Sequence, residues 1–223
     1  MIDEGIEWAR SKLAVIDVVT TGMDPKQNRI CSLTMVLIDD GHIHSPRGFH
    51  VEQRQYSSAF QYTGIPFDDQ QFMTFPQVLS HILPALHDRI PVAYDAPRAR
   101  RFVTAEFRRV FAGLSKYDLD LIAAASPPTF HESVVWIDPF IWTRKLVRDQ
   151  WQPSPIAECK RQHIYMEPGH VSTTAAVAAA RVLMFMQDRM PATYGQLAAE
   201  QARLAVRYEA IIAAQHNQIR HRP

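Results

Sequence analysis

The stretch LAVIDVVTTGMDP, residues 13–25, guides the interpretation of the whole chain. Its first half is rich in β-branched residues and predicts a short buried strand that carries one carboxylate, Asp17. Its second half combines Thr, Gly, Asp and Pro and is typical of a turn. Asp17 and the turn that follows are therefore the first candidate functional region.

The segments around this stretch predict an alternation of strands and helices. A second strand is expected at residues 29–38 and a third at 43–51, joined by a turn. The other expected elements are a helix over 74–86 that Pro84 should kink or end, a strand over 90–94, a helix over 98–112, a strand over 134–137, a helix through 141–147 and an Ala-rich helix over 173–186. This order predicts an α/β fold in which a mixed β-sheet carries helices on its faces.

The composition fits a globular protein of ordinary size. Of 223 residues, 47% are hydrophobic and 21% charged, and the formal net charge is +1. With no global positive field, any nucleic-acid binding needs a local patch. Cys31 and Cys159 are the only cysteines, which excludes a disulfide framework and a Cys-rich zinc module. We read no signal peptide or membrane span, and expect a cytoplasmic protein without membrane association.

The chain changes character beyond Pro191, where a terminal amphipathic helix is predicted. The residues that recur on one face of it are Leu197, Gln201, Leu204, Tyr208, Ile211 and Gln215. We divide the chain into a domain over 1–190 and a C-terminal helical extension over 191–223. The helix over 194–215 either packs on its own domain or docks on a protein partner or in a homodimer.

Five segments, in order along the chain, resemble the DnaQ-like (DEDDh) 3′–5′ exonucleases. Residues 16–25 resemble the family's first motif, Asp-x-Glu-Thr-Thr-Gly-Leu-Asp-Pro. The other segments are 62–65, 91–103, 137–139 with Arg144-Lys145-Leu146, and Gly169-His170 with Ala176. The resemblance spans roughly residues 11–188 and implies the ribonuclease-H-like fold.

The chemistry implied by the resemblance needs four carboxylates to hold two Mg²⁺ ions, and a histidine to take a proton from the attacking water. Asp17 and His170 stand where the family has a carboxylate and that histidine. The other three ligand positions fall on Val19, Ala99 and Ala175, and hydrocarbon side chains cannot bind a metal. We therefore predict a vestigial catalytic pair, no metal ion on Asp17 alone, and no cofactor.

Arginines enter beside the second motif. Arg98 replaces the family's Phe, and Arg100 and Arg101 follow it. They are candidates to bind phosphate without a metal. The alternative is that they lie, with two later arginines, on the solvated face of one helix.

The turn after Asp17 is a second candidate nucleic-acid contact. The resemblance implies that the family grips the 3′-terminal nucleotide with the residues at Thr20, Thr21, Gly22 and Met23. The alternative is a turn kept for folding alone.

Histidines form a weaker pattern. His42 and His44 alternate on an expected strand, with His50 nearby, but no Cys or acidic residue supplies a third ligand at diagnostic spacing. We expect a solvated hairpin rather than a metal site.

We predict an exonuclease-fold protein that no longer cleaves and serves as a nucleic-acid-binding or protein-scaffolding module, within a DNA replication, repair or mobile-element assembly. The alternative is an active or weakly active 3′–5′ exonuclease on single-stranded DNA or RNA, with Mg²⁺ or Mn²⁺ held by Asp17 and migrated carboxylates such as Asp95 or Asp138. Activity requires three carboxylates near Asp17, and nucleic-acid binding requires arginines that face it. Scaffolding requires an uncovered stripe on residues 194–215.

Overall fold

The computed structural model describes residues 2–52, 72–112, 131, 133–147, 154–167 and 171–220, with side chains for all of these except 171–172 and 210–220. The strands are β1 (Leu13–Thr20), β2 (Ile30–Asp39), β3 (His42–Ile43), β4 (Arg47–Val51), β5 (Phe72–Met73) and β6 (Ile90–Val92). The helices are α1 (Phe75–Leu86), α2 (Ala96–Val110), α4 (Pro139–Val147), α5 (Pro155–Arg161), α6 (Val171–Met186) and α7 (Tyr194–Arg220), with short 3₁₀ turns at Trp8–Arg10 and Gln187–Arg189. None of these helices is long and apolar enough to cross a membrane.

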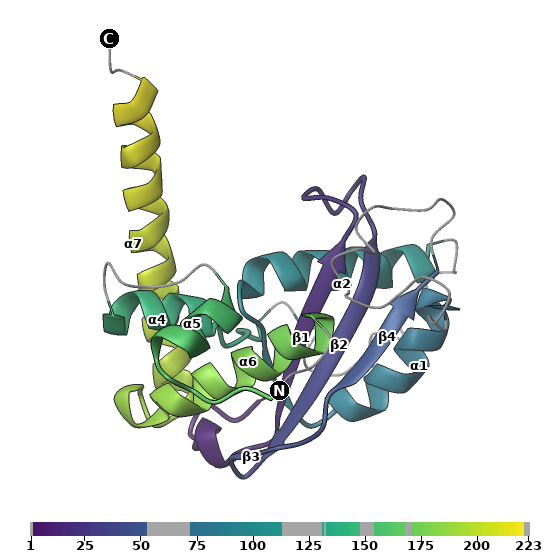
Figure 1. Cartoon of the computed structure of the whole chain (residues 1–223), viewed down its shortest axis with the longest axis horizontal. Coiled ribbons are helices and arrows are strands. Elements are labelled where there is room, and N and C mark those ends of the chain that lie inside the picture. Colours follow the sequence, from purple (N-terminus) through teal and green to yellow (C-terminus); the bar gives the residue numbers. More distant parts are fainter. Residues whose placement is uncertain are drawn as a thin grey trace.

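The six strands form one mixed sheet in the order β5-β4-β2-β1-β6, with β3 paired to β2 (Figure 1). β1 and β4 run antiparallel to β2, whereas β6 runs parallel to β1. The mixed sheet flanked by helices confirms the predicted ribonuclease-H-like fold class.

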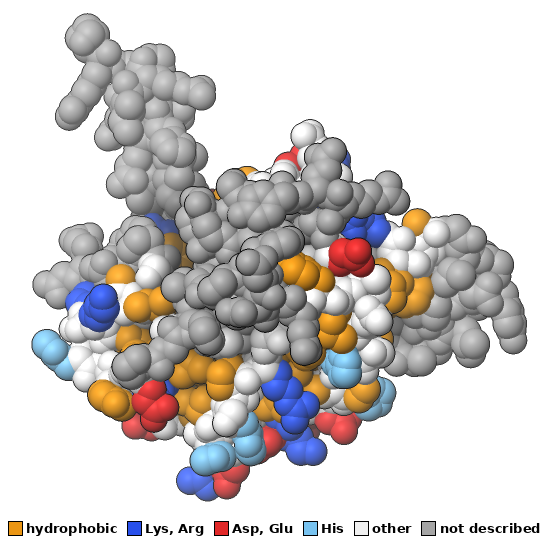
Figure 2. All heavy atoms as spheres, turned by 45° about the vertical axis from the view of Figure 1, so that its right-hand side comes forward, with side chains coloured by type: hydrophobic (Ala, Val, Ile, Leu, Met, Phe, Trp, Pro, Cys, Tyr) orange, Lys and Arg blue, Asp and Glu red, His pale blue; other side chains and the backbone are white. Residues whose placement is uncertain are grey.

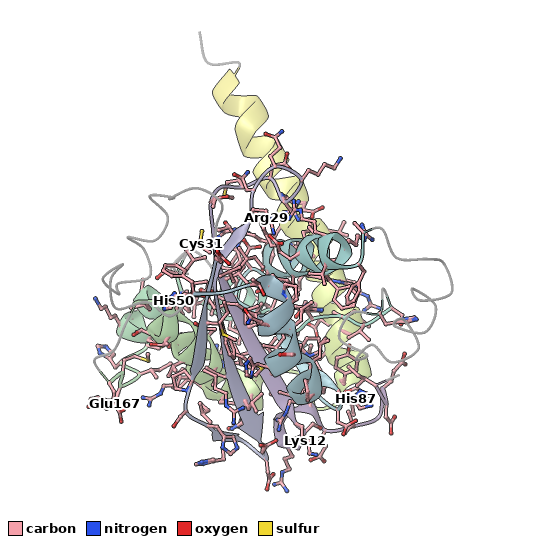
Figure 3. The ribbon with its side chains drawn as sticks, turned by 90° about the vertical axis from the view of Figure 1, so that its right-hand side faces the viewer. Lys12, Arg29, Cys31, His50, His87 and Glu167 are labelled. Atoms are coloured by element: carbon pink, nitrogen blue, oxygen red, sulfur yellow. The ribbon has the colours of Figure 1, made fainter. Side chains whose placement is uncertain are left out.

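Helices cover both faces of the sheet, and the alternation of side chains along β1 decides which residues meet which layer (Figure 3). Leu13 and Val15 point toward α4 and α6 and pack with Trp142 and Leu183. The opposite face of β1 packs on α1 and α2 through Ala14, Ile16 and Val18. Because Asp17 continues the series of Leu13 and Val15, its side chain lies on the α6 side, where the apolar row ends.

Two sequence predictions need correction. The expected third strand over 43–51 is two strands, β3 and β4, separated by residues 44–46. Pro84, which was expected to kink or end the helix over 74–86, does not end it, because α1 continues to Leu86. Pro84 lies close to the end of α1, so few helical hydrogen bonds beyond it are affected.

The strand predicted over 134–137 is also wrong, since only one parallel bridge forms, between Ile137 and Val92. Side chains of α7 occupy the backbone groups that another strand would use. The Tyr194 hydroxyl accepts from the Val135 N–H at 3.0 Å and donates to its carbonyl at 2.8 Å. Gln201 Nε2 donates to the Trp136 carbonyl at 2.8 Å. The start of α7 thus covers this edge of the sheet.

The start of α7 is part of the core, whereas its later turns extend away from the body (Figure 1). Leu197 is completely buried and Gln201 is 5% exposed. On the same face Leu204 and Tyr208 are half-buried, and the Arg144 guanidinium lies 4.2 Å from the Tyr208 ring centroid. Val206 is 69% exposed. The part of the predicted stripe formed by Ile211 and Gln215 lies outside the described side chains.

Candidate functional site

Asp17 lies on β1 directly opposite Thr34 of β2, on the face of the sheet that α6 covers. Burial raises the pKa of Asp17 to about 6, and nearby Arg98 and a hydrogen bond from the Val18 backbone oppose that rise. The raised pKa marks a charge that is poorly solvated in the folded protein. Metal binding requires the deprotonated carboxylate, and a carboxyl group with this pKa is mostly deprotonated at pH 7.5, so the other three positions, rather than this pKa, argue against a metal ion.

Asp17 is expected to lower the stability of the fold at neutral pH. The pKa of Asp17 lies above its ordinary value of 3.8, so the folded state favours the protonated carboxyl group. Its contribution to the free energy of unfolding is therefore fully present below about pH 4 and is lost as the pH rises through about 6. Asp17→Asn should therefore raise the free energy of unfolding at pH 7.5 by about 1–2 kcal/mol. Urea unfolding at about pH 4 and pH 7.5 measures this, with the exposed Asp88→Asn as a control. A less stable Asp17→Asn protein at pH 7.5 would contradict it.

The other three positions of the implied metal site carry no ligand in the structure. Val19 packs with Cys31 and Phe72. Ala99 lies on the buried face of α2 and is 4% exposed, and Ala175 is half-buried on α6. Across the described ranges, no three His, Cys, Asp or Glu side chains are grouped so that they could hold a metal ion. The described residues therefore do not fit a pair of Mg²⁺ ions, while His170 lies outside them.

Asp95 and Asp138, the candidates for migrated ligands, are arranged around the start of α2. Asp138 is 1% exposed, and its carboxylate accepts the N–H groups of Asp95, Ala96 and Phe140 at 3.1, 3.0 and 2.9 Å. Asp95 is exposed and takes a left-handed conformation, with φ of 65°, as the residue before α2. Asp138 thus satisfies backbone donors at the N-terminus of α2, the helix that carries Arg98.

Of the three predicted arginines, the structure brings only Arg98 to Asp17. Its Nη2 donates to the Thr20 hydroxyl at 3.0 Å, and its charge acts on Asp17. Arg100 instead donates to the carbonyl of His131 at 3.1 Å, and Arg101 to that of Pro97 at 3.2 Å. Residues two apart on a helix point about 200° apart, so Arg98 and Arg100 cannot face one site.

The turn after Asp17 is held in a defined shape. The Thr20 hydroxyl donates to the Gly22 carbonyl at 2.7 Å, and Thr21 N–H donates to the Arg29 carbonyl at 2.9 Å. A Cβ atom on Gly22 would lie 2.5 Å from Oδ1 of Asn28, so a larger residue would displace that side chain. Met23, in contrast, is 74% exposed. The turn therefore presents an exposed apolar side chain next to the Thr20–Arg98 contact.

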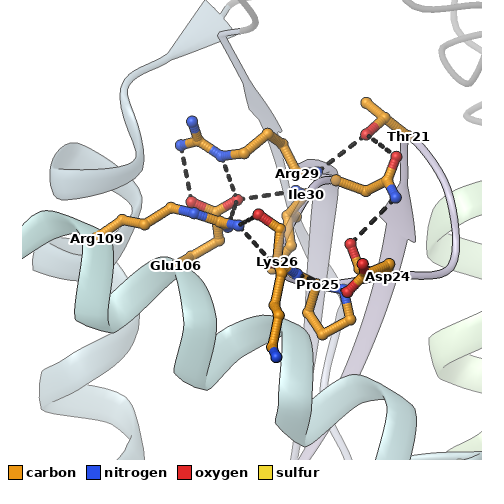
Figure 4. Close-up of polar contacts among 9 residues, drawn as sticks. Thr21, Asp24, Pro25, Lys26, Arg29, Ile30, Glu106 and Arg109 are labelled. Carbon is orange, nitrogen blue, oxygen red and sulfur yellow. Dashed lines mark hydrogen bonds and ion pairs between the residues drawn. The ribbon is translucent and has the colours of Figure 1, made fainter.

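A buried carboxylate that sequence reasoning missed anchors this turn from α2 (Figure 4). Glu106 is fully buried and accepts from Arg29 Nε at 2.6 Å and Nη2 at 2.8 Å. It also accepts from the N–H of Ile30 at 3.2 Å and from Arg109 at 3.1 Å, and Arg109 donates onward to the carbonyls of Pro25 and Lys26. The network ties the turn between β1 and β2 to α2, so Glu106 is a positioning residue.

The histidines of the weaker sequence pattern, His42, His44 and His50, lie on β3, on the residue after it and on β4. His42 and His44 are exposed on the hairpin of β3, with ring centroids 5.0 Å apart, and His44 Nε2 lies 2.9 Å from Oδ2 of Asp39. His50 of β4 is buried opposite Ser32, with its ring 6.5 Å from that of Phe72.

Comparison with known proteins places this geometry in a known fold. No protein-family model matches the chain, and neither does any curated protein. Exonuclease I of E. coli, in a complex with single-stranded DNA, has a TM-score of 0.62 and 15% identity, over 82% of this chain and 42% of that one. The nuclease domain of 3′hExo, a DEDDh family member bound to rAMP, has 0.60 and 16%, over 81% and 93%. Exonuclease X, in complex with 5′-overhanging duplex DNA, has 0.55 and 19%, over 85% and 99%.

At these identities the likeness establishes the fold alone. The fold is that of the DEDDh exonucleases, as the resemblance implied.

Proposed function

We propose that the protein binds a single strand of nucleic acid at the Asp17 site without cleaving it. The observation that carries the proposal is the position of the Arg98 guanidinium. It donates a hydrogen bond to the Thr20 hydroxyl at 3.0 Å, and its charge partly offsets the rise that burial causes in the pKa of Asp17. Val19, Ala99 and Ala175 meanwhile occupy the positions of the missing carboxylates. The site thus combines the permanent cation of Arg98 with the acidic group of Asp17.

Charge balance explains how such a site accommodates phosphate. In the family's chemistry four carboxylates are neutralised by two divalent metal ions. Here one carboxyl group faces one guanidinium, so the local charge is balanced without a metal. A guanidinium donates to phosphate oxygens, often in pairs, and stays charged at every relevant pH. It cannot activate a water molecule as a metal ion does, which supports binding without hydrolysis.

The neighbouring turn supplies the second part of the proposed contact. Met23 is exposed, and the turn behind it is anchored through Glu106. An exposed apolar side chain beside a cation is suited to a base and its phosphate. Among the solved structures of similar fold, exonuclease I is bound to single-stranded DNA and to a dT13 oligonucleotide. These complexes support a single strand as the ligand class of this chain.

Binding should not depend on a metal and should depend on Arg98. Fluorescence anisotropy of a 5′-labelled single-stranded oligonucleotide, measured in EDTA and in Mg²⁺, should give the same Kd in both. Arg98→Ala should weaken binding about tenfold, the size of a lost charge-assisted hydrogen bond. Arg101→Ala is the matched control on the same helix and should change Kd less than about twofold.

Two results would contradict the proposal. Binding abolished by EDTA would show that a metal ion is required. Equal weakening by Arg98→Ala and Arg101→Ala would indicate diffuse attraction to the surface rather than a site at Asp17.

A further inference from the structure

We infer that the far end of the turn between β1 and β2 binds a second phosphate of the same single strand, roughly five nucleotides from the end held at Asp17. This inference rests on the proposed function and deepens it, because it assigns the strand a length and a direction across the surface. The cations at this place are Lys26 and Arg29 of the turn and Arg109 of α2 (Figure 4).

Two contacts fix how the turn lies along α2. Near the start of the turn the Thr20 hydroxyl accepts from Arg98 at 3.0 Å, and near its end the Lys26 carbonyl accepts from Arg109 at 3.1 Å. Arg98 and Arg109 lie about three helical turns apart on the same side of α2, which corresponds to about 16 Å along the helix axis. The turn therefore extends along α2 from Arg98 to Arg109.

The outer side of the turn is accessible over this distance. Met23, between the two contacts, is 74% exposed, and Lys26 and Gln27 are exposed as well. Nucleotides of a stacked strand lie about 3.4 Å apart, so about 16 Å corresponds to roughly five nucleotides. A strand that has one end at Asp17 and passes over Met23 would therefore bring a phosphate to Lys26 after roughly five nucleotides.

The buried network below the turn directs positive charge outward. The side chain of Glu106 is 1% exposed, whereas that of Arg29 is 43% exposed. Arg29 donates to Glu106 through Nε and Nη2, and its Nη1 makes no hydrogen bond to the residues that the structure describes. Arg109 shares the same carboxylate. Arg29 is thus held in place and presents its remaining donors to solvent, as a phosphate contact requires.

Lys26 adds a second exposed cation. Across the described part of the chain no carboxylate forms an ion pair with its Nζ. Asp24 is the acidic residue of the turn, and its Oδ1 accepts the Lys26 N–H at 2.9 Å. Lys26, Arg29 and Arg109 outnumber Asp24 and Glu106, so a net positive charge remains. Figure 2 shows Lys and Arg side chains interspersed with acidic and hydrophobic ones, so phosphate binding depends on such small clusters rather than on a broad basic surface.

The test compares 5′-labelled dT3 and dT9 bound to the full chain in EDTA. Lys26→Gln should weaken dT9 binding about fivefold and change dT3 binding less than about twofold, since dT3 is too short to reach Lys26. It should also reduce the dependence of log Kd on log salt concentration for dT9 by about 0.7, the value for one phosphate contact on a single strand. Gln27→Lys should tighten dT9 binding about two- to threefold. Arg29 is kept in all variants, because its loss would release the turn.

Lys12→Gln is the matched control. Lys12 is exposed and lies directly before β1, at the opposite end of that strand from the turn, and Figure 3 shows it far from Arg29. The same change of charge at this position should alter neither dT3 nor dT9 binding.

The outcomes separate this inference from the proposed function. If dT9 binding depends on Arg98 but is unchanged by Lys26→Gln and Gln27→Lys, the second contact is overturned while the Asp17 site stands. Equal weakening of dT3 and dT9 by Lys26→Gln, or equal weakening of dT9 by Lys12→Gln and Lys26→Gln, likewise overturns it. If no oligonucleotide binds the folded protein, both proposals fail.

Discussion

Replacing Glu106 by alanine is expected to lower the free energy of unfolding by about 2–4 kcal/mol. Glu106 is fully buried, and its carboxylate is shared by Arg29, Arg109 and the N–H of Ile30. Removing it leaves two guanidinium groups without their partner and one buried N–H without an acceptor. Urea unfolding of the two proteins measures the difference.

The same substitution should weaken single-strand binding, because the turn from Thr20 to Met23 loses its anchor on α2. Glu7→Ala is the control, since Glu7 and Arg10 form a pair at 3.8 Å with both side chains largely exposed. Such surface pairs contribute little, so no measurable change is expected. A Glu106→Ala protein as stable as wild type would show that the buried network does not hold the turn.

Replacing Gln201 by alanine is expected to cost about 3 kcal/mol or more. Its Oε1 accepts the Asp138 N–H at 2.8 Å and Trp142 Nε1–H at 3.1 Å, while its Nε2 donates to the Trp136 carbonyl. Each buried polar group left without a partner costs about 1–3 kcal/mol. The substitution removes the partner of three such groups, namely the Asp138 N–H, the Trp142 indole N–H and the Trp136 carbonyl. Thermal and urea unfolding both measure it.

Gln196→Ala is the matched control for Gln201. Gln196 lies on the same helix but is exposed, so its loss should change stability only slightly. Equal stability of the Gln201→Ala and Gln196→Ala proteins would mean that α7 is an independent appendage. A large effect of Gln201→Ala alone would mean that the first turns of α7 are needed to complete the sheet edge.

The overall architecture could be predicted from the sequence because each strand or helix is indicated by a pattern within its own residues. The β-branched run around Asp17 and the helix-period apolar positions of α1 and α2 each report their own element. The strand predicted over 134–137 was wrong because only Ile137 bridges to β6, while side chains of α7 bind the backbone of Val135 and Trp136. Hydrogen bonds between Tyr194, Gln201 and that segment join residues about 60 positions apart, and no local pattern reports them.

The site shows the same limit. The sequence predicted Asp17 and the turn as the candidate site, and the loss of the other carboxylates stays a prediction that follows from the resemblance. The separation of Arg98 from Arg100 was available in principle, because residues two apart on a helix point about 200° apart. Arg101 is three residues from Arg98 and shares its side of the helix, so only the structure shows that it binds the Pro97 carbonyl instead. Glu106 was not available, since a charged residue on a helix is usually solvated. Its contacts with Arg29 and with the N–H of Ile30 join residues 77 and 76 positions apart, and no local pattern predicts them.

The most direct test of the central claim is the release of nucleotides from a 3′-labelled single-stranded oligonucleotide in Mg²⁺ and in Mn²⁺. Asp17→Ala protein is measured in parallel, and binding of each sample is checked by anisotropy under the same conditions. Wild-type protein is expected to retain the oligonucleotide and to release no nucleotide with either metal. Metal-dependent release that Asp17→Ala abolishes would contradict it, because it would mean that a functional metal site persists around Asp17.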